Sequence, residues 1–157
     1  MKYENFDGRA GQTALYCLLW CAMVALPLPV LADGEAFTRE AGSPELDWGP
    51  CPEFFPEGCA IAVLQGDPAQ HNADILIRFP GQSEIPHHWH SSAERMVLIS
   101  GELLVDYDGQ EPVVMRAGTY AYGPARLPHD GHCRSEEDCV LFIAFEGPVD
   151  AISSSTD

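Results

Sequence analysis

Lysine is almost missing from this 157-residue chain, since none follows Lys2, and the whole sequence has 8 basic residues against 24 acidic ones. The formal net charge is therefore -16 at pH 7. A surface this acidic repels phosphate backbones and anionic lipid headgroups. We therefore exclude nucleic acid and anionic membrane surfaces as partners, whereas a small or cationic ligand is permitted. The simpler alternative is that the acidity only keeps the protein soluble.

Polar residues are scarce in one N-terminal stretch, residues 14–32, which is interrupted only by Pro27 and Pro29. Lys2 and Arg9 precede this apolar stretch, as basic residues do in a secretory signal peptide. About 19 apolar residues could also just span a bilayer, so an uncleaved anchor is the rival interpretation. The two prolines favour a cleaved signal peptide.

The segment Val30-Leu31-Ala32 offers small residues at the positions that signal peptidase reads. Cys21 follows the bulky Trp20, which argues against lipid modification of that cysteine. We therefore predict a signal peptide over residues 1–32, a mature N-terminus at Asp33, and a periplasmic or secreted protein without membrane attachment after cleavage.

Cysteine is sparse beyond the signal peptide, and neither neighbouring pair has the CxxC spacing of a zinc ribbon. An even number of cysteines in an oxidising compartment indicates disulfides, and four cysteines allow three pairings. Closeness in sequence favours the pairs Cys51–Cys59 and Cys133–Cys139. Free buried thiols or thiolate metal ligands are the alternatives. The four residues are Cys51, Cys59, Cys133 and Cys139.

A long helical pattern is also missing, and short apolar runs bounded by turn-forming residues recur instead. Residues 73–79 alternate apolar and polar side chains, as in a strand with one buried face, and Asp108-Gly109 is typical of a hairpin turn. We predict an all-β sandwich or small barrel. The expected strands are 60–64, 73–79, 95–99, 102–107, 112–116, 119–122 and 139–145.

The expected domain organisation follows from this pattern. Residues 33–54 lack periodicity and are interpreted as an N-terminal arm, and residues 55–150 as one β domain. Residues 151–157 are polar and are predicted to be a disordered tail.

Metal-ligand chemistry is concentrated in one short run. His88 and His90 are one residue apart, so in a strand they point to the same side, with Trp89 on the other. Glu94 follows, and His129 supplies a third imidazole. Neutral imidazoles with a carboxylate suit divalent transition ions. An exposed histidine patch is the alternative interpretation.

The segment from Gly81 to Gly101 resembles the first cupin motif, and the segment from Gly118 through Pro124 to His129 resembles the second. This resemblance extends over roughly residues 55–147. It implies a double-stranded β-helix, or jelly roll, that holds one divalent ion inside the barrel. The ligands that the resemblance implies are His88, His90, Glu94 and His129.

The sequence departs from the two motifs at three points. Six residues, rather than five, separate Gly81 from the histidine pair. Counting back from Glu94 nevertheless selects His88 over its neighbour His87, which is then expected at the rim. The other two departures are Arg126 in place of a glycine and Cys133 in place of an asparagine.

The segments Leu46-Asp47-Trp48-Gly49-Pro50 and Glu146-Gly147-Pro148 are similar to those of small single-domain cupins related to the cupin part of an anti-sigma factor. Four residues near the motifs are candidates for catalysis. Arg126 could clamp an anionic substrate, and His132 could move a proton from the loop expected after the second motif. Tyr120 and Tyr122 share one strand face, expected to line the barrel. Tyr107 is interpreted as a packing residue.

Two functions of different classes remain open at this level. The first is an exported metal-dependent enzyme that acts on a small organic molecule. The second is a non-catalytic cupin that binds metal or a small ligand in sensing or scavenging, which predicts an apolar pocket without an acid–base residue. Fe(II) would suit a dioxygenase, whereas Zn, Ni or Mn would act as a Lewis acid in lyase, isomerase or hydrolytic chemistry. Outside the cytoplasm the affinity order favours Cu or Zn. A homodimer is left open.

Overall fold

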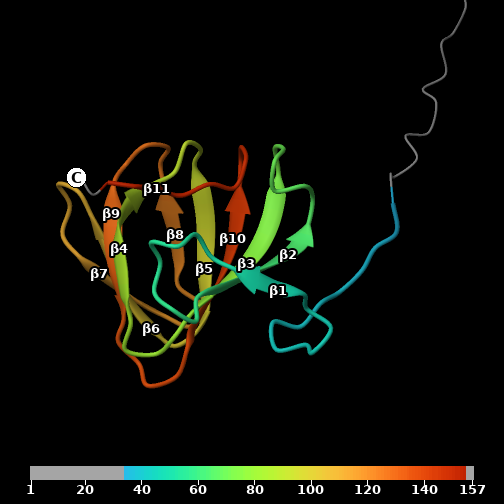
Figure 1. Ribbon diagram of the computed structural model, residues 1–157, viewed down its shortest axis with the longest axis horizontal. Helices are drawn as coiled ribbons and strands as arrows, with labels where there is room; N and C mark the ends of the chain where they lie inside the picture. Colours follow the sequence, from blue (N-terminus) through green and yellow to red (C-terminus); the bar gives the residue numbers. More distant parts are fainter. Residues whose placement is uncertain (1–33, 155–157) are drawn as a thin grey trace, which may run out of the picture. The chain divides into compact units, whose positions relative to one another are not determined.

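The computed structural model describes residues 34–154, which form eleven strands in two antiparallel sheets and no helix (Figure 1). The predicted signal peptide lies outside the described residues. No helix of the described part has the length and apolar character needed to cross a bilayer. The strands are β1 (Trp48–Pro50), β2 (Ala60–Gln65), β3 (Ala73–Phe79), β4 (Glu84–Trp89), β5 (Glu94–Ser100), β6 (Glu102–Tyr107), β7 (Val113–Arg116), β8 (Tyr120–Gly123), β9 (His129–Cys133), β10 (Cys139–Phe145) and β11 (Ile152–Ser153).

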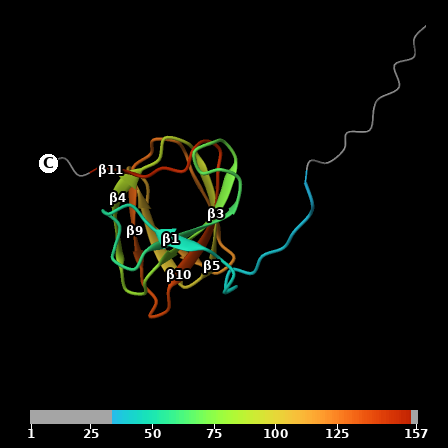
Figure 2. The same ribbon diagram turned by 45° about the vertical axis from the view of Figure 1, so that its right-hand side comes forward.

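The two sheets face each other and form a jelly-roll barrel, as predicted. One sheet has the strand order β1-β2-β3-β10-β5-β8 and the other β11-β4-β9-β6-β7. Figure 2 shows β4 and β9 on one side of the barrel and β3 and β5 on the other. Non-consecutive neighbours such as β3 and β10 bring distant parts of the chain together, so the two halves of the metal motif can meet in one barrel.

Alternate residues of the central strands point into the barrel. Every second residue of β10 is buried, beginning with Cys139, although the whole strand is apolar. In β3 every second residue from Ala73 is likewise buried, and Leu76 is buried in addition. Leu141 lies directly opposite Ile77, and Ile143 directly opposite Ile75. Such cross-strand apolar pairs stabilise a sheet and fix its register. This pattern places one continuous apolar face inside the barrel.

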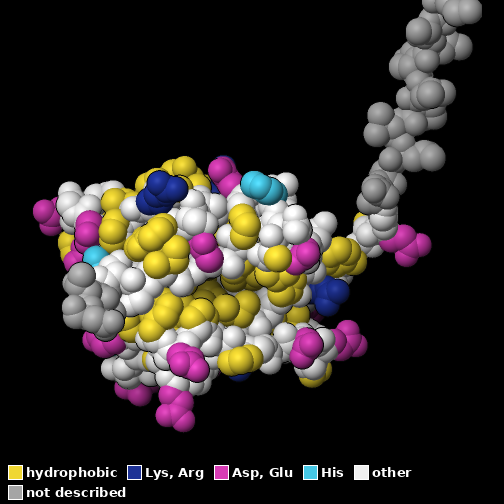
Figure 3. Space-filling view, turned by 45° about the horizontal axis from the view of Figure 1, so that its top comes forward, with side chains coloured by type: hydrophobic (Ala, Val, Ile, Leu, Met, Phe, Trp, Pro, Cys, Tyr) yellow, Lys and Arg dark blue, Asp and Glu magenta, His cyan; other side chains and the backbone are white. Residues whose placement is uncertain are grey.

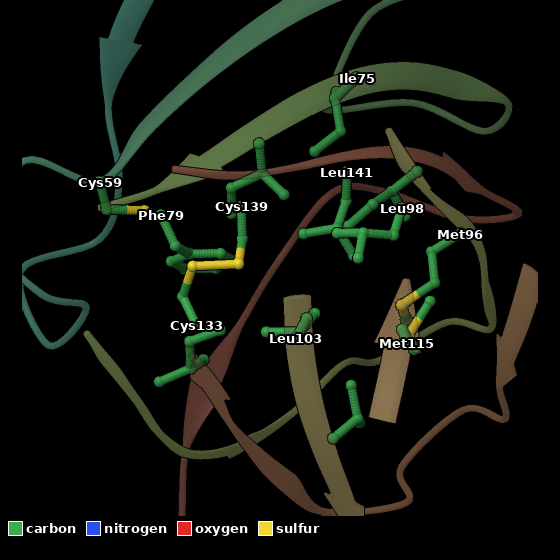
Figure 4. Packing of buried hydrophobic residues seen from close by; sticks show 14 of the residues in the cluster. Cys59, Ile75, Phe79, Met96, Leu98, Leu103, Met115, Cys133, Cys139 and Leu141 are labelled. Atoms are coloured by element: carbon green, nitrogen blue, oxygen red, sulfur yellow. A yellow bond between two sulfur atoms is a disulfide. The ribbon is translucent and has the colours of Figure 1, made fainter. Parts of the chain in front are cut away.

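The interior packs closely at the end of the barrel away from the histidines. Leu98, Met115 and the Cys133–Cys139 disulfide are almost fully buried, and Figure 4 shows Leu141, Leu98 and Met96 pointing toward the space between the sheets. The same set of fully buried side chains contains one carboxylate, Glu94. Charged side chains are almost never buried unless they are paired or bind a metal, so this residue requires an explanation.

Both disulfides predicted from proximity in sequence are present. Cys133 and Cys139 join the end of β9 to the start of β10 and so connect the two sheets. Cys51 and Cys59 close the loop between β1 and β2.

The hairpin turn at Asp108-Gly109 is confirmed, since Gly109 has φ 76° and Gln110 N–H donates to the Tyr107 carbonyl at 3.0 Å. The prediction of a disordered tail is wrong for its first part. Ile152 and Ser153 form β11, which pairs with Trp89 and His88 of β4. Residues 155–157 lie outside the described part.

Two further expectations require correction. The second half of the predicted arm belongs to the barrel, because Leu46 is buried and Trp48 of β1 pairs with Ala62 of β2. The segment expected to be a loop around His129 is the strand β9 (His129–Cys133). The Asp, Gly and His residues of this segment have low strand propensity, so its sequence does not indicate a strand. Hydrogen bonding to β4 on one side and β6 on the other holds it in the sheet.

Candidate metal centre

Three buried imidazoles meet at one end of the barrel. The ligand nitrogens of His88, His90 and His129 all lie within 4.8 Å of one another, so this group could hold a metal ion. His88 is near the end of β4 and lies directly opposite His129, the first residue of β9. His90 lies in the turn that follows β4. Hydrogen bonding between two strands of one sheet therefore sets most of the geometry.

A β-bulge in β4 explains the extra residue in the first motif. Three steps along β4, from Ile85 to His88, match only two steps along β9, from Gly131 to His129. A bulge of this kind accommodates one additional residue and re-aims the side chains that follow it. His88 points inward as a result. His87 is half exposed and lies 2.9 Å from the carboxylate of Asp108.

Each of the three imidazoles is oriented by a backbone carbonyl. The Nδ1 of His88 donates to the Pro86 carbonyl at 2.7 Å, and that of His129 to the Leu127 carbonyl at 3.2 Å. The Nδ1 of His90 donates to the carbonyl of Asp150. A proton on Nδ1 leaves the lone pair on Nε2, which is the arrangement found in metal-binding histidines.

Glu94, the first residue of β5, completes the cluster. Its Oε2 lies 3.6 Å from His90 Nε2, and its Oε1 lies 3.6 Å from His129 Nε2. The side chain is 2% exposed, and Oε1 has no hydrogen-bond partner. A buried carboxylate oxygen without a partner is unfavourable. A divalent cation bound to the Glu94 carboxylate would offset the cost of burying its charge, so the residues present fit a metal ion.

The electrostatics of these side chains are also those of a metal site. Burial, together with the neighbouring His129 and His90, lowers the pKa of His88 to about 3. Burial likewise lowers the pKa of His129 to about 4. Both imidazoles are therefore neutral near pH 7, as ligands must be. Burial raises the pKa of the Glu94 carboxyl, with His90 acting in the opposite direction.

The four side chains open into a cavity of about 260 Å³. Most of its wall is aliphatic or aromatic, and Phe55 and Phe145 pack against the rings of His88 and His90 at centroid distances of 5.0 Å and 5.4 Å. Apart from the four candidate ligands, the only ionisable residues among the described lining are Asp130 and Asp150. On the outside, Figure 3 shows hydrophobic side chains in a band across one face, with acidic side chains around it.

The expectation that Tyr120 and Tyr122 line the barrel is wrong. They do share one face of β8, but this is the outer face, where they are 58% and 50% exposed. The inward positions of β8 belong to Ala121 and Gly123. A Cβ on Gly123 would lie only 2.7 Å from Glu94 Oε1, so the carboxylate leaves no room for a side chain there.

Arg126 and His132 also lie outside the cavity lining. Arg126 is exposed, with φ 64°, and reaches the site only through its backbone N–H, which donates to the His90 carbonyl at 2.9 Å. His132 alternates away from the interior on β9 and lies 3.5 Å from the carboxylate of Glu84. None of the four catalytic candidates therefore lines the cavity.

Two residues near the site were not among the site residues predicted from the sequence. Asp150 accepts the His90 hydrogen bond through its backbone carbonyl, and its carboxylate accepts from Ser91 N–H at 2.8 Å. No side-chain pattern can reveal a backbone contact of this kind. Tyr107, at the end of β6, packs its ring against His129 at a centroid distance of 4.9 Å.

A jelly-roll barrel with three buried histidines at one end is the arrangement that the cupin motifs imply. Residues 75–145 match the profile of the family described as the cupin domain. The matched segment is less than half of the chain. No curated protein matches the sequence significantly.

Several solved structures share this fold. The DMSP lyase DddQ from Ruegeria pomeroyi DSS-3 has 16% identity over 69% of this chain and 61% of that chain, with a TM-score of 0.60. An RmlC-like cupin from Shewanella frigidimarina NCIMB 400 has 20% identity over 74% and 93% of the two chains, with a TM-score of 0.57. KdgF from Halomonas sp. has 15% identity over 64% and 87%, with a TM-score of 0.52. The chain thus spans less than two thirds of the lyase, and at these identities the likeness concerns the fold alone.

Proposed function

We propose that this protein is an exported metal-dependent cupin that acts on a small organic molecule, with one divalent ion held by His88, His90, His129 and Glu94. The observation that carries the proposal is that three carbonyl-oriented imidazoles meet beside a cavity, with the buried carboxylate of Glu94 3.6 Å from two of them. Four protein ligands leave positions for a ligand on a five- or six-coordinate ion, as a catalytic site requires.

The donor set of three nitrogens and one oxygen suits Fe, Mn, Ni, Zn or Cu. When bound, the ion would supply either Lewis-acid polarisation of a ligand oxygen or, for a redox metal, electron transfer. The residues of the chain have the remaining tasks. His88 and His129 stay neutral, Glu94 balances charge, and the apolar wall excludes water from the reacting molecule.

The cavity wall supports a proposal for the class of ligand. The described lining contains no Lys or Arg side chain, so an anionic group would find a partner only at the metal. Aliphatic and aromatic side chains cover the rest of the wall, and an apolar body gains from contact with them. We therefore expect a small molecule with an apolar body and a single donor group for the metal.

A non-catalytic binding protein is the second candidate, and one observation favours it. Among the described lining residues, only Asp130 and Asp150 carry an ionisable side chain besides the candidate ligands. The Asp150 carboxylate is already engaged with Ser91 N–H. In favour of catalysis, two structural neighbours are named as DMSP lyases.

Export is part of the proposal. The sequence Val30-Leu31-Ala32 favours cleavage before Asp33, and the two disulfides are consistent with an oxidising compartment, periplasmic or extracellular. N-terminal sequencing of the periplasmic or secreted protein should therefore begin at Asp33. Recovery of Met1 in a membrane fraction would contradict this. The relation to the cupin part of an anti-sigma factor is likewise a proposal, supported by the segment Leu46-Asp47-Trp48-Gly49-Pro50.

The metal site is tested by elemental analysis of protein purified from its native compartment. The wild type should contain one ion per chain, and the double variant His90→Ala/His129→Ala should contain none. The matched control is His87→Ala/His132→Ala, because both histidines lie outside the cavity lining. One tightly bound ion in the first double variant, or loss of the ion in the control, would show that the ligands are assigned wrongly.

Catalysis is tested separately. The protein is loaded with Fe, Mn, Ni, Zn and Cu in turn and screened with small organic acids, thiols and sulfonium compounds. Turnover by one metal form supports the enzyme. If every form is inert while a ligand binds reversibly, the non-catalytic candidate is correct.

A further inference from the structure

Two buried oxygens beside the metal site have no hydrogen-bond partner, although they belong to neighbouring side chains. They are Oε1 of Glu94 and the hydroxyl of Tyr107. Unsatisfied buried polar atoms are rare in folded proteins, and two of them at one place indicate an interaction that is completed in another state of the site.

Gly123 locates the two oxygens relative to each other. A Cβ on this glycine would lie 2.7 Å from Glu94 Oε1 and 3.1 Å from the Tyr107 hydroxyl. The missing side chain of Gly123 therefore leaves a small space that both oxygens border. Gly123 is also the direct cross-strand partner of Glu94, so sheet hydrogen bonding holds this space beside the carboxylate.

Tyr107 reaches this point from the opposite sheet. It ends β6, lies directly opposite His129 on β9, and packs its ring on the His129 imidazole. Glu94 and Gly123 belong to the other sheet, on β5 and β8. Tyr107 does not line the cavity, so it can act on the site only through side chains such as His129, and not on a molecule in the cavity.

We propose that Tyr107 is a positioning residue whose O–H donates to Oε1 of Glu94 and so leaves Oε2 to bind the metal. This inference rests on the metal site proposed above. A neutral phenol is a hydrogen-bond donor at neutral pH, and a carboxylate oxygen is its natural acceptor. The bond would hold Glu94 as a ligand through one oxygen and would connect the two sheets at the metal end of the barrel. Hydrogen bonds to metal-binding carboxylates are known to affect metal affinity.

The test compares Tyr107→Phe with the wild type by chelator competition and by the visible spectrum of the Co²⁺-loaded protein. The variant keeps the ring on His129 and removes only the hydroxyl. Affinity should fall about 10–100-fold, with one ion per chain retained, and the cobalt spectrum should change because the Glu94 carboxylate is free to bind through both oxygens. The matched control is Tyr120→Phe, which removes an exposed hydroxyl on the outer face and should change neither measurement.

Two further variants separate this role from general destabilisation. Gly123→Ala should also change the cobalt spectrum, because its Cβ displaces the Glu94 carboxylate. In a Glu94→Gln background, Tyr107→Phe should change affinity less than about twofold, since coupled residues are non-additive. Unchanged affinity and cobalt spectrum in Tyr107→Phe would overturn the inference while leaving the metal site intact. A wild type that binds no metal would instead contradict the proposed function.

Discussion

His88 and His129 are direct cross-strand partners on β4 and β9, and their imidazole rings lie 4.3 Å apart between centroids. Two buried imidazoles at this distance cannot both be protonated without strong repulsion. Burial is the main reason for their lowered pKa values, of about 3 for His88 and about 4 for His129. The metal-free fold is therefore expected to depend on pH through this pair.

The first prediction concerns the stability of the apo protein in acid. Because these pKa values are lower when folded than the ordinary 6.5, the unfolded chain binds more protons between about pH 6.5 and pH 3–4. The contribution of His88 and His129 to the free energy of unfolding is therefore complete above pH 6.5, and it is lost as the pH falls through this window. Glu94 has the opposite effect on the pH dependence of stability. Because its pKa is raised in the folded protein, its contribution to the free energy of unfolding is lost as the pH rises.

Glu94→Gln removes the opposing carboxylate, so the apo form of this variant should lose stability steadily from pH 6.5 to pH 4. The loss should amount to a few kcal/mol, since one unit of pKa shift corresponds to about 1.4 kcal/mol. Urea unfolding in the presence of a chelator measures it. The control adds His88→Asn and His129→Asn to Glu94→Gln. In this control the free energy of unfolding should depend much less on pH. Equal slopes in the two proteins would refute the role of the pair.

The second prediction distinguishes the two disulfides. The Cys51–Cys59 loop carries Pro52 and Phe55, which line the cavity, and Phe55 packs edge-on against His88. Replacing either cysteine pair by alanine should cost about 2–3 kcal/mol, because both loops are short. Only the loss of Cys51–Cys59 should also weaken metal binding, because it loosens the wall behind His88. Denaturation and metal competition on both variants measure the two effects, and equal metal affinities would contradict this assignment.

The third prediction concerns the charge of the ligand. Hexanoate and adipate have the same carbon chain, but adipate carries a second carboxylate that would be buried against an apolar wall. The described lining offers no basic side chain to pair with it. Burial of an unpaired charge is strongly unfavourable, so hexanoate should bind the metal-loaded protein at least about tenfold more tightly. Calorimetry with the two acids measures this, and tighter binding of adipate would show that a cation lies within reach of the cavity.

The sequence predicted the architecture and the meeting of His88, His90 and His129, because both depend on the spacing of residues within the motifs. Alternation identified strands such as β3, and the position of Glu94 selected His88 over His87, which the bulge in β4 explains. Alternation alone could not show which face of β8 is buried and which is exposed. Alternation correctly places Tyr120 and Tyr122 together, but the buried face of β8 is determined by Glu94 on the neighbouring strand and not by the hydrophobicity of β8 itself.

Strands β9 and β11 could not be predicted because their own residues carry little strand signal. The polar segment from His129 to Cys133 becomes a strand through its pairing with β4 and β6. Ile152 and Ser153 form a strand through their pairing with the strand that carries His88. Both cases depend on partners distant in sequence, which a local pattern cannot reveal.

The last prediction concerns this C-terminal segment. The Asp150 carbonyl accepts the hydrogen bond from His90 Nδ1, and β11 pairs with the end of β4, so the segment supports two of the candidate ligands. Val149 and Ala151 also line the cavity. Deleting residues 149–157 should therefore lower metal affinity about 10–100-fold, as removal of other supporting groups does. The fold should survive, because β11 is a two-residue edge strand.

Asp150→Ala is the matched control for this deletion. It removes the carboxylate that accepts from Ser91 N–H but keeps the backbone carbonyl that orients His90. It should reduce stability by about 1 kcal/mol and leave metal affinity within a few-fold of the wild type. Circular dichroism confirms that the deleted protein is folded, and chelator competition measures its affinity. A folded deletion variant with wild-type affinity would mean that packing against Phe145 is enough to orient His90.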